Sequence, residues 1–173
     1  MKTSKTAQWR VASPIGPLFL VASEKGLRGI FWKKHSAPVP RTLRSPEREI
    51  RMLSRSVLQL RSYFAGRLKK FALPTDAEGT PFQKKVWSEL ARIPYGQTRS
   101  YRDIARRIKN PKAVRAVGSA NGRNPLCVVV PCHRVIAADG SIGGYSGGLD
   151  KKIKLLRLER RGSSGFTFSA RKA

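Results

Sequence analysis

The sequence predicts an α/β domain in the amino-terminal half of the chain, followed by a mostly helical domain that contains a helix-turn-helix. Three short runs rich in β-branched and aromatic residues, separated by turn-forming residues, precede a stretch with helical periodicity. Residues 69–79 then contain Pro, Asp and Gly and form a linker. Beyond the linker, two short helices with a tight joint have the arrangement by which helix-turn-helix proteins read DNA.

The first domain, residues 1–78, is expected to be an antiparallel three-stranded sheet covered by one helix. The three runs are Trp9 to Ala12, Leu18 to Ala22 and Leu27 to Trp32, at the spacing of hairpins. After a basic loop, apolar side chains recur at spacings of three and four, as on the buried face of a helix: Ile50, Leu53, Val57, Leu60 and Phe64. Gly66 is expected to end this helix.

The second domain, residues 79–161, is expected to begin with a capped helix. Thr80 is an N-cap residue, Pro81 takes the first helical position and Gln83 the third, which is the pattern of a capping box. The side chains expected on the buried face of this helix are Phe82, Val86, Leu90 and Ile93.

Two short helices follow the first helix of this domain. Ser100 with Asp103 caps the first of them, and the Asn-Pro pair at Asn110 is expected to cap the second. Small and apolar residues of the second helix alternate with the basic residues Lys112 and Arg115, so this is the candidate reading helix. Many helical hairpins bind nothing, and the pattern alone leaves that alternative open.

A reactive cysteine is the clearest chemical feature of the chain. The apolar run Leu126 to Val130 is expected to form a buried strand that Pro131 ends, which places Cys132 at the end of that strand. Neighbouring cations lower the pKa of a cysteine thiol, so His133 and Arg134 favour a nucleophilic thiolate. The alternative is a buried, inert cysteine beside a chance histidine.

The rest of the chain is expected to hold a loop, a last helix and a tail. Glycine occupies positions 140, 143, 144, 147 and 148, which indicates a loop, and no strand and helix flank it in the order of a phosphate-binding loop. The last helix is expected to bury Leu149, Ile153, Leu156 and Leu158. Residues 162–173 are small and basic, and are expected to form a disordered tail.

The charge of the chain predicts a polyanionic partner. Lys and Arg outnumber Asp and Glu by 36 to 10, which gives a formal net charge of +26. A generally basic surface without a specific partner is the alternative. No basic segment has a broad apolar face and no apolar run approaches membrane-spanning length, so no membrane partner is expected.

The cysteines and histidines predict neither a disulfide framework nor a metal site. Cys127 and Cys132 flank one apolar run, which suits reduced thiols in the cytoplasm. His35 and His133 are the only histidines, and no metal-ligand spacing occurs, so no metal and no cofactor are expected.

The chain contains the motif Pro131-Cys132-His133-Arg134, with Asn124-Pro125 before it and Gly-Gly-Tyr-Ser-Gly-Gly at residues 143–148 after it. In this combination of motifs the chain resembles the methylated-DNA-protein-cysteine methyltransferases. The similarity runs from about residue 80 to residue 159 and is weaker in the amino-terminal half. It implies a ribonuclease-H-like first domain and a winged-helix-like second domain. It also implies repair of double-stranded DNA by a single, irreversible transfer of an alkyl group from O6 of a flipped-out guanine to Cys132, without a cofactor. The protein is expected to be a monomer in the cytoplasm, and to associate with the nucleoid if its source is bacterial.

The resemblance also implies roles for individual residues. The cysteine proton would pass through water to the histidine, which a glutamate orients, and a tyrosine would protonate the leaving guanine. The residues implied in transfer are Cys132, His133, Glu159, Asn124 and Tyr101. Those implied in binding the base are Tyr145, Ser146 and, through its backbone carbonyl, Val135. Those implied in binding DNA are Tyr101, Lys112, Ser119 and Arg115, which would fill the gap left by the extruded nucleotide.

Two positions depart from the family pattern. Asn121 stands where relatives often carry an apolar residue that packs against the minor groove, and Cys127 where proline or an aliphatic residue is usual. Three rival functions remain open: a non-catalytic protein that binds the lesion, a cysteine hydrolase, and a basic nucleoid or regulatory protein. Relatives of the first kind replace the nucleophile, and direct adjacency of Cys132 and His133 weighs against the second.

Overall fold

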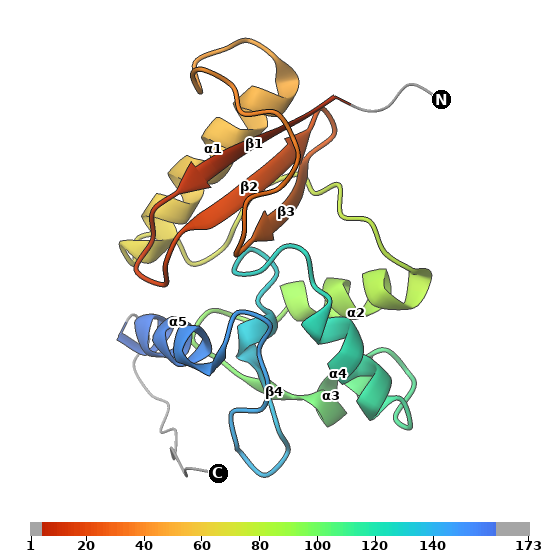
Figure 1. Cartoon of the computed structure of the whole chain (residues 1–173). Helices are drawn as coiled ribbons and strands as arrows, with labels where there is room; N and C mark the ends of the chain where they lie inside the picture. Colours follow the sequence, from red (N-terminus) through yellow and green to blue (C-terminus); the bar gives the residue numbers. More distant parts are fainter. Residues whose placement is uncertain (1–4, 162–173) are drawn as a thin grey trace. The chain divides into compact units, whose positions relative to one another are not determined.

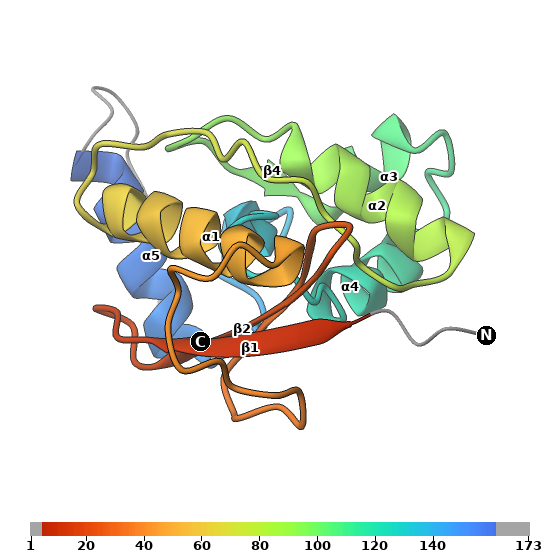
Figure 2. The ribbon, with the colours of Figure 1, turned by 90° about the horizontal axis from the view of Figure 1, so that it is seen from above.

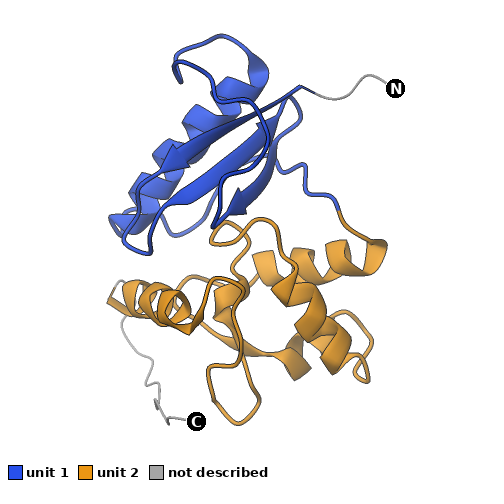
Figure 3. Ribbon diagram, viewed as in Figure 1, with its two compact units in different colours: residues 1–78 blue, residues 79–173 orange. Residues whose placement is uncertain are grey.

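The computed structural model describes residues 5–161, and the chain divides into two compact units, residues 1–78 and residues 79–173 (Figure 3). The division falls at the end of the linker segment. The predicted tail, residues 162–173, lies outside the described residues. Within residues 5–161, no helix has both the length and the apolar composition needed to cross a bilayer.

The first unit is an antiparallel sheet with a helix on one face (Figures 1 and 2). Strands β1 (Thr6–Val11), β2 (Leu18–Ser23) and β3 (Leu27–Phe31) pair in the order β1-β2-β3. Helix α1 (Arg48–Phe64) packs on this sheet, and its buried side chains include Ile50, Leu53, Val57 and Leu60. Gly66 follows the helix with φ of +73°, a left-handed conformation that suits glycine after a helix end. The predicted hairpins and covering helix are confirmed.

The second unit is mostly helical, as predicted (Figure 1). Its helices within residues 79–161 are α2 (Pro81–Ala91), α3 (Tyr101–Arg107), α4 (Val114–Gly122) and α5 (Leu149–Arg161). A short strand, β4 (Arg99–Ser100), pairs in parallel with β5 (Val135–Ile136). A 3₁₀-helical turn, η1 (Cys132–Arg134), leads directly into β5 and carries the predicted nucleophile.

The capping boxes predicted for two helices are confirmed. In α2, the Thr80 hydroxyl accepts a hydrogen bond from the Gln83 N–H (3.2 Å), and the Gln83 side chain accepts one from the Thr80 N–H (2.8 Å). Ser100 and Asp103 make the same reciprocal pair at the start of α3. These local bonds determine where each helix begins, and so they place Tyr101 at the first position of α3.

Helix α4 begins later than predicted. Its N-cap is Ala113, which has no capping side chain, and the prediction that Asn110 caps it is wrong. The Asn110 carbonyl instead accepts a bond from the Ala113 N–H (3.0 Å) in a turn, and Lys109 has a left-handed φ of 58°. The proline at position 111 disfavours helical backbone at Asn110, so the joint between α3 and α4 occupies residues 108–113.

The apolar run Leu126 to Val130 is a buried loop and not the predicted strand. The Val129 N–H donates to the Cys127 carbonyl (2.9 Å) and the Val130 N–H to the Leu126 carbonyl (2.8 Å). Between them Val128 has φ of 72°, a conformation that costs a β-branched residue on the order of 1–3 kcal/mol. The run is mostly buried, as its composition indicates, but two of its backbone bonds close within the run, and of its five residues only Leu126 takes part in a β-bridge.

Helix α5 buries a different face from the one predicted. Leu149 is 52% exposed, whereas Lys152, Leu155 and Glu159 are at most 1% exposed. These three residues are three and four apart, so they form one stripe of the helix. Two of the three are charged, and both belong to the site described below.

Candidate active site

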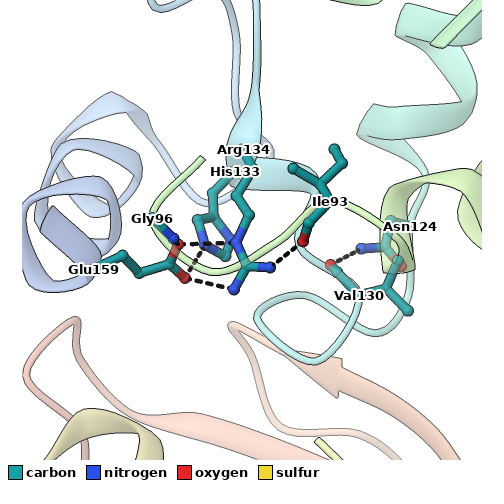
Figure 4. Close-up of polar contacts among 7 residues, drawn as sticks. All are labelled: Ile93, Gly96, Asn124, Val130, His133, Arg134 and Glu159. Atoms are coloured by element: carbon teal, nitrogen blue, oxygen red, sulfur yellow. Dashed lines mark hydrogen bonds and ion pairs between the residues drawn. The ribbon is translucent and has the colours of Figure 1, made fainter. Parts of the chain in front are cut away.

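Cys132 is positioned by a loop that one side chain, Asn124, closes (Figure 4). The Asn124 amide donates to the Val130 carbonyl (2.8 Å), and its oxygen accepts from the Leu126 N–H (3.0 Å). The Cys132 N–H donates to the same Val130 carbonyl (2.8 Å). Because Asn124 binds both ends of the loop, the thiol has a fixed place at the start of η1.

Glu159 of α5 binds both residues that follow the cysteine (Figure 4). Its Oε1 lies 2.8 Å from His133 Nε2, and its carboxylate accepts bonds from Arg134 Nε (2.8 Å) and Nη2 (2.9 Å). The Gly96 N–H also donates to Glu159 (3.1 Å), and Arg134 Nη1 donates to the Ile93 carbonyl (2.6 Å). The three side chains are at most 6% exposed, so the carboxylate and the guanidinium form a buried, hydrogen-bonded charge pair.

Burial determines the protonation state of His133, and its contact with Glu159 determines which ring nitrogen carries the proton. Burial by itself would raise the pKa of Glu159, but hydrogen bonds from His133 and Arg134 and the Arg134 charge hold it well below its usual range. Burial lowers the pKa of His133 despite the adjacent carboxylate, so the imidazole is neutral near pH 7. Nε2 must carry the proton in order to donate to an ionised carboxylate, which leaves Nδ1 as an acceptor. Nδ1 is buried and has no hydrogen-bond partner within residues 5–161.

The thiol of Cys132 is protonated at rest. Burial raises its pKa, and hydrogen bonds together with the positive charge of Lys152 offset that rise only in part. The prediction that His133 and Arg134 lower this pKa is wrong, because the imidazole is neutral and the guanidinium is paired with a carboxylate. The thiol therefore needs a base before it can act as a nucleophile.

Lys152 is a site residue that the sequence analysis missed. Its ammonium group is fully buried and donates to the carbonyls of Val135 (2.6 Å), Gly144 (3.2 Å) and Ile142. Burial lowers its pKa to about 8, while the nearby Cys132 acts in the opposite direction. The one available signal was its spacing of seven residues from Glu159, which places both on one helix face.

Tyr101 lies between α4 and the glycine-rich loop. A Cβ on Gly143 would lie 3.3 Å from the Tyr101 hydroxyl, and a Cβ on Gly118 would lie 3.9 Å from the Tyr101 ring, so the ring packs closely against both glycines. Gly143 also has φ of +65°, which other residues rarely adopt. Burial and the neighbouring Cys132 raise the pKa of Tyr101, so its hydroxyl keeps its proton. In the same loop Tyr145 is half-buried and Ser146 is exposed.

Apart from Tyr101, the residues expected to bind DNA are exposed and belong to α4 or to the residues just before it. Arg115 and Ser119 are exposed and four residues apart, so they share one face of α4. Lys112 is exposed just before the helix. Asn121 is only 4% exposed and points into the unit, so it is not a groove-packing side chain. Within residues 5–161, no three His, Cys, Asp or Glu side chains lie together as a metal site would require.

Comparison with known proteins gives matches over nearly the whole chain. The family model described as 6-O-methylguanine DNA methyltransferase, ribonuclease-like domain, matches residues 10–77, and the one described as its DNA binding domain matches residues 81–161. The methylated-DNA-protein-cysteine methyltransferase of Methanosarcina acetivorans is 52% identical over 149 residues, which is 85% of this chain and 94% of that protein. The Mycobacterium tuberculosis protein of the same name is 46% identical over 150 residues, 87% of this chain and 90% of that one.

Solved structures agree with the sequence matches. The crystal structure of the Mycobacterium tuberculosis O6-methylguanine methyltransferase has a TM-score of 0.80 at 39% identity, covering 93% of this chain and 96% of that one. A crystal structure of the OGT of the same organism in complex with DNA has a TM-score of 0.79 at 41% identity, covering 91% and 94%. The chain belongs to the 6-O-methylguanine DNA methyltransferase family.

Proposed function

We propose that this protein repairs double-stranded DNA by transferring an alkyl group from O6 of a guanine to Sγ of Cys132, once per molecule. The observation that carries the proposal is the buried Cys132-His133-Glu159 arrangement, in which Nε2 of the imidazole is bound to the carboxylate and Nδ1 is free to accept a proton. The names of the relatives and the DNA complex of a similar structure support the same activity. The protein acts as a monomer inside the cell, where its two cysteines remain reduced.

The proposed reaction moves one proton and one alkyl group. The Cys132 thiol gives its proton, through a bridging water, to His133 Nδ1, and the thiolate attacks the alkyl carbon. A carbon–sulfur bond forms as the bond from carbon to guanine O6 breaks. Tyr101 donates a proton to the leaving guanine and is reprotonated, through water, by the proton that His133 took from the thiol. His133 returns to its neutral form, and the net result is a thioether and a neutral guanine. A thioether is not reversed by a simple proton transfer, which accounts for a single turnover.

The base must leave the duplex before it can reach a buried thiol. Extrusion costs a few kcal/mol of lost stacking. The guanine would then enter beside Tyr145 and Ser146, in the loop that Lys152 holds through the Gly144 carbonyl. The Val135 carbonyl already accepts a bond from Lys152, and its second lone pair is available to the guanine amine.

The mass of the intact protein tests the proposed function. Incubation with duplex DNA that contains O6-methylguanine should add the mass of one methyl group to each protein molecule and no more. A protein that only binds the lesion would show no gain in mass, and a hydrolase would release product repeatedly without a gain. Either result would remove the proposal.

Lys152→Met is expected to slow transfer most strongly near neutral pH. Loss of the ammonium removes the cation that lowers the thiol pKa, so the thiol pKa rises and the pH–rate profile shifts to higher pH. The variant should also lose about 1–3 kcal/mol of stability, because buried carbonyls lose their donor. Single-turnover rates across a pH series give the measurement, and Lys154→Met, at an exposed position of the same helix, is the control. An equal loss of rate at every pH would limit Lys152 to a structural role.

Arg115→Ala is expected to slow repair of duplex DNA about ten-fold or more, since the side chain would compensate part of the lost stacking. Reaction with free O6-alkylguanine should change little, because nothing is extruded. Rates on the two substrates at one low salt concentration give the comparison. Arg123→Ala, which removes the same charge from an exposed position at the end of α4, is the control. A parallel loss on both substrates would mean that Arg115 supports the fold or the pocket.

A further inference from the structure

Helix α1 of the first unit carries three exposed arginines on one face, separate from its buried residues. Arg48, Arg51 and Arg55, called here the α1 arginine row, are all exposed. They are three and four residues apart, so they lie on one face within about 10 Å along the helix axis. The acidic residue of this helix, Glu49, lies about 100° around the axis from Arg48 and does not interrupt the row.

The α1 arginine row works against the stability of its own helix. Like charges three or four residues apart destabilise a helix by about 0.2–0.5 kcal/mol for each pair. Arg48, in the first turn, also opposes the helix dipole, which favours negative charge there. Within residues 5–161, no ion pair neutralises the three arginines, although Arg55 Nη2 donates a long bond to the Ala72 carbonyl (3.4 Å).

The proposed function leaves the charge of the first unit unexplained. Residues 1–78 contain 16 Lys and Arg against 5 Asp and Glu, a formal net charge of +11. Every residue assigned above to DNA binding lies in the second unit. The excess positive charge of the first unit is therefore not part of the reading helix or of the pocket.

We infer that the α1 arginine row is a second DNA-binding surface, which contacts the phosphates of duplex DNA without reading the sequence. Guanidinium groups form bidentate, charge-assisted bonds with phosphate oxygens. Duplex DNA carries one negative charge for about every 1.7 Å of its axis, so three arginines within about 10 Å can each bind a phosphate. Such contacts also remove the repulsion along the row. This surface requires no alkyl transfer and is separable from the proposed activity.

The salt dependence of binding to undamaged duplex DNA tests this inference on the full-length protein. The triple variant Arg48→Gln, Arg51→Gln, Arg55→Gln should flatten the plot of log affinity against log salt concentration by about 2.7 units of slope, at 0.9 for each lost phosphate contact. Its affinity should approach that of the unchanged protein at high salt. Lys112→Gln, in the second unit, is the reference for the loss of a single contact.

The matched control removes three charges elsewhere on the first unit. Lys25, Lys33 and Lys34 are exposed and lie outside α1, so Lys25→Gln, Lys33→Gln, Lys34→Gln changes the net charge by the same amount. The inference is supported if the salt-dependence slope falls by about 2.7 units in the arginine variant while that of the lysine variant stays within about one unit of the unchanged protein. Equal changes in both variants, or no change in either, would overturn it, because the row would then act only as general charge or as a solvated face. Thermal unfolding of the arginine variant should be unchanged or slightly higher, which excludes misfolding as the cause.

Discussion

Cys132→Ala is expected to abolish alkyl transfer while DNA affinity stays nearly unchanged. The thiol is the atom that receives the alkyl group, and alanine has no nucleophile. The side chain is 1% exposed, so it contributes no contact with phosphates. Intact-mass measurement after incubation with alkylated DNA should show no gain, and binding of undamaged duplex should match that of the unchanged protein.

Cys127→Ala is the matched control, because it makes the same chemical change at the other buried cysteine. Burial raises the pKa of Cys127 well above its usual value, and the nearby Cys132 acts in the same direction, so its thiol stays protonated. The control variant should therefore still gain one alkyl group for each molecule. Peptide mapping that places the alkyl group on Cys127 in the unchanged protein would contradict the central assignment.

Local sequence signals were sufficient for much of the fold. The hairpins of the first unit depend on alternating patterns and on turn residues between them, and both are readable in short windows. The capping boxes at Thr80 and Ser100 depend on residues three apart, so the starts of α2 and α3 were predictable as well. The cap of α4 was not, because Asn110 and Pro111 form a turn that uses the same residue types as a cap.

The site itself is where patterns of hydrophobicity failed. Two charged residues, Lys152 and Glu159, lie on the buried face of α5. The apolar pattern of this helix therefore predicted a buried face made of leucines that are partly exposed. The run Leu126 to Val130 reads as a buried strand, but Asn124 ties it into a loop that no periodicity indicates. In both cases a polar side chain lies near Cys132: Lys152 from α5 and Asn124 from the loop. In the second case an irregular loop replaces the expected strand. The family resemblance singled out Glu159 and Asn124. In the structure Glu159 lies 2.8 Å from His133 Nε2, and Asn124 is bonded to the Val130 carbonyl in the loop before Cys132.

Glu159→Gln is expected to destabilise the protein and to slow transfer together. The carboxylate is the counter-charge of Arg134, which is 5% exposed, and removal of one partner from a buried pair costs about 3–5 kcal/mol. A neutral amide also holds the Nε2 proton of His133 less strongly, so Nδ1 becomes a weaker base for the thiol proton. Chemical denaturation and single-turnover rates at neutral pH measure the two effects. Asp150→Asn, an exposed acid in the first turn of the same helix, is the matched control and should lose at most about 1 kcal/mol.

The dependence of stability on pH separates the charge of Glu159 from its shape. Because the pKa of Glu159 is held below its usual value, its stabilisation is complete above about pH 4.3, the value of an unfolded glutamate, and is lost as the pH falls further. Burial lowers the pKa of His133, so the folded state also loses stability as the pH falls below about 6.5. Glu159→Gln should remove the loss below about pH 4.3 that belongs to the carboxylate, so the stabilities of the variant and the unchanged protein should converge in acid. If the stability curves of the variant and the unchanged protein stay parallel down to the lowest pH, Glu159 stabilises the fold through packing and not through its charge.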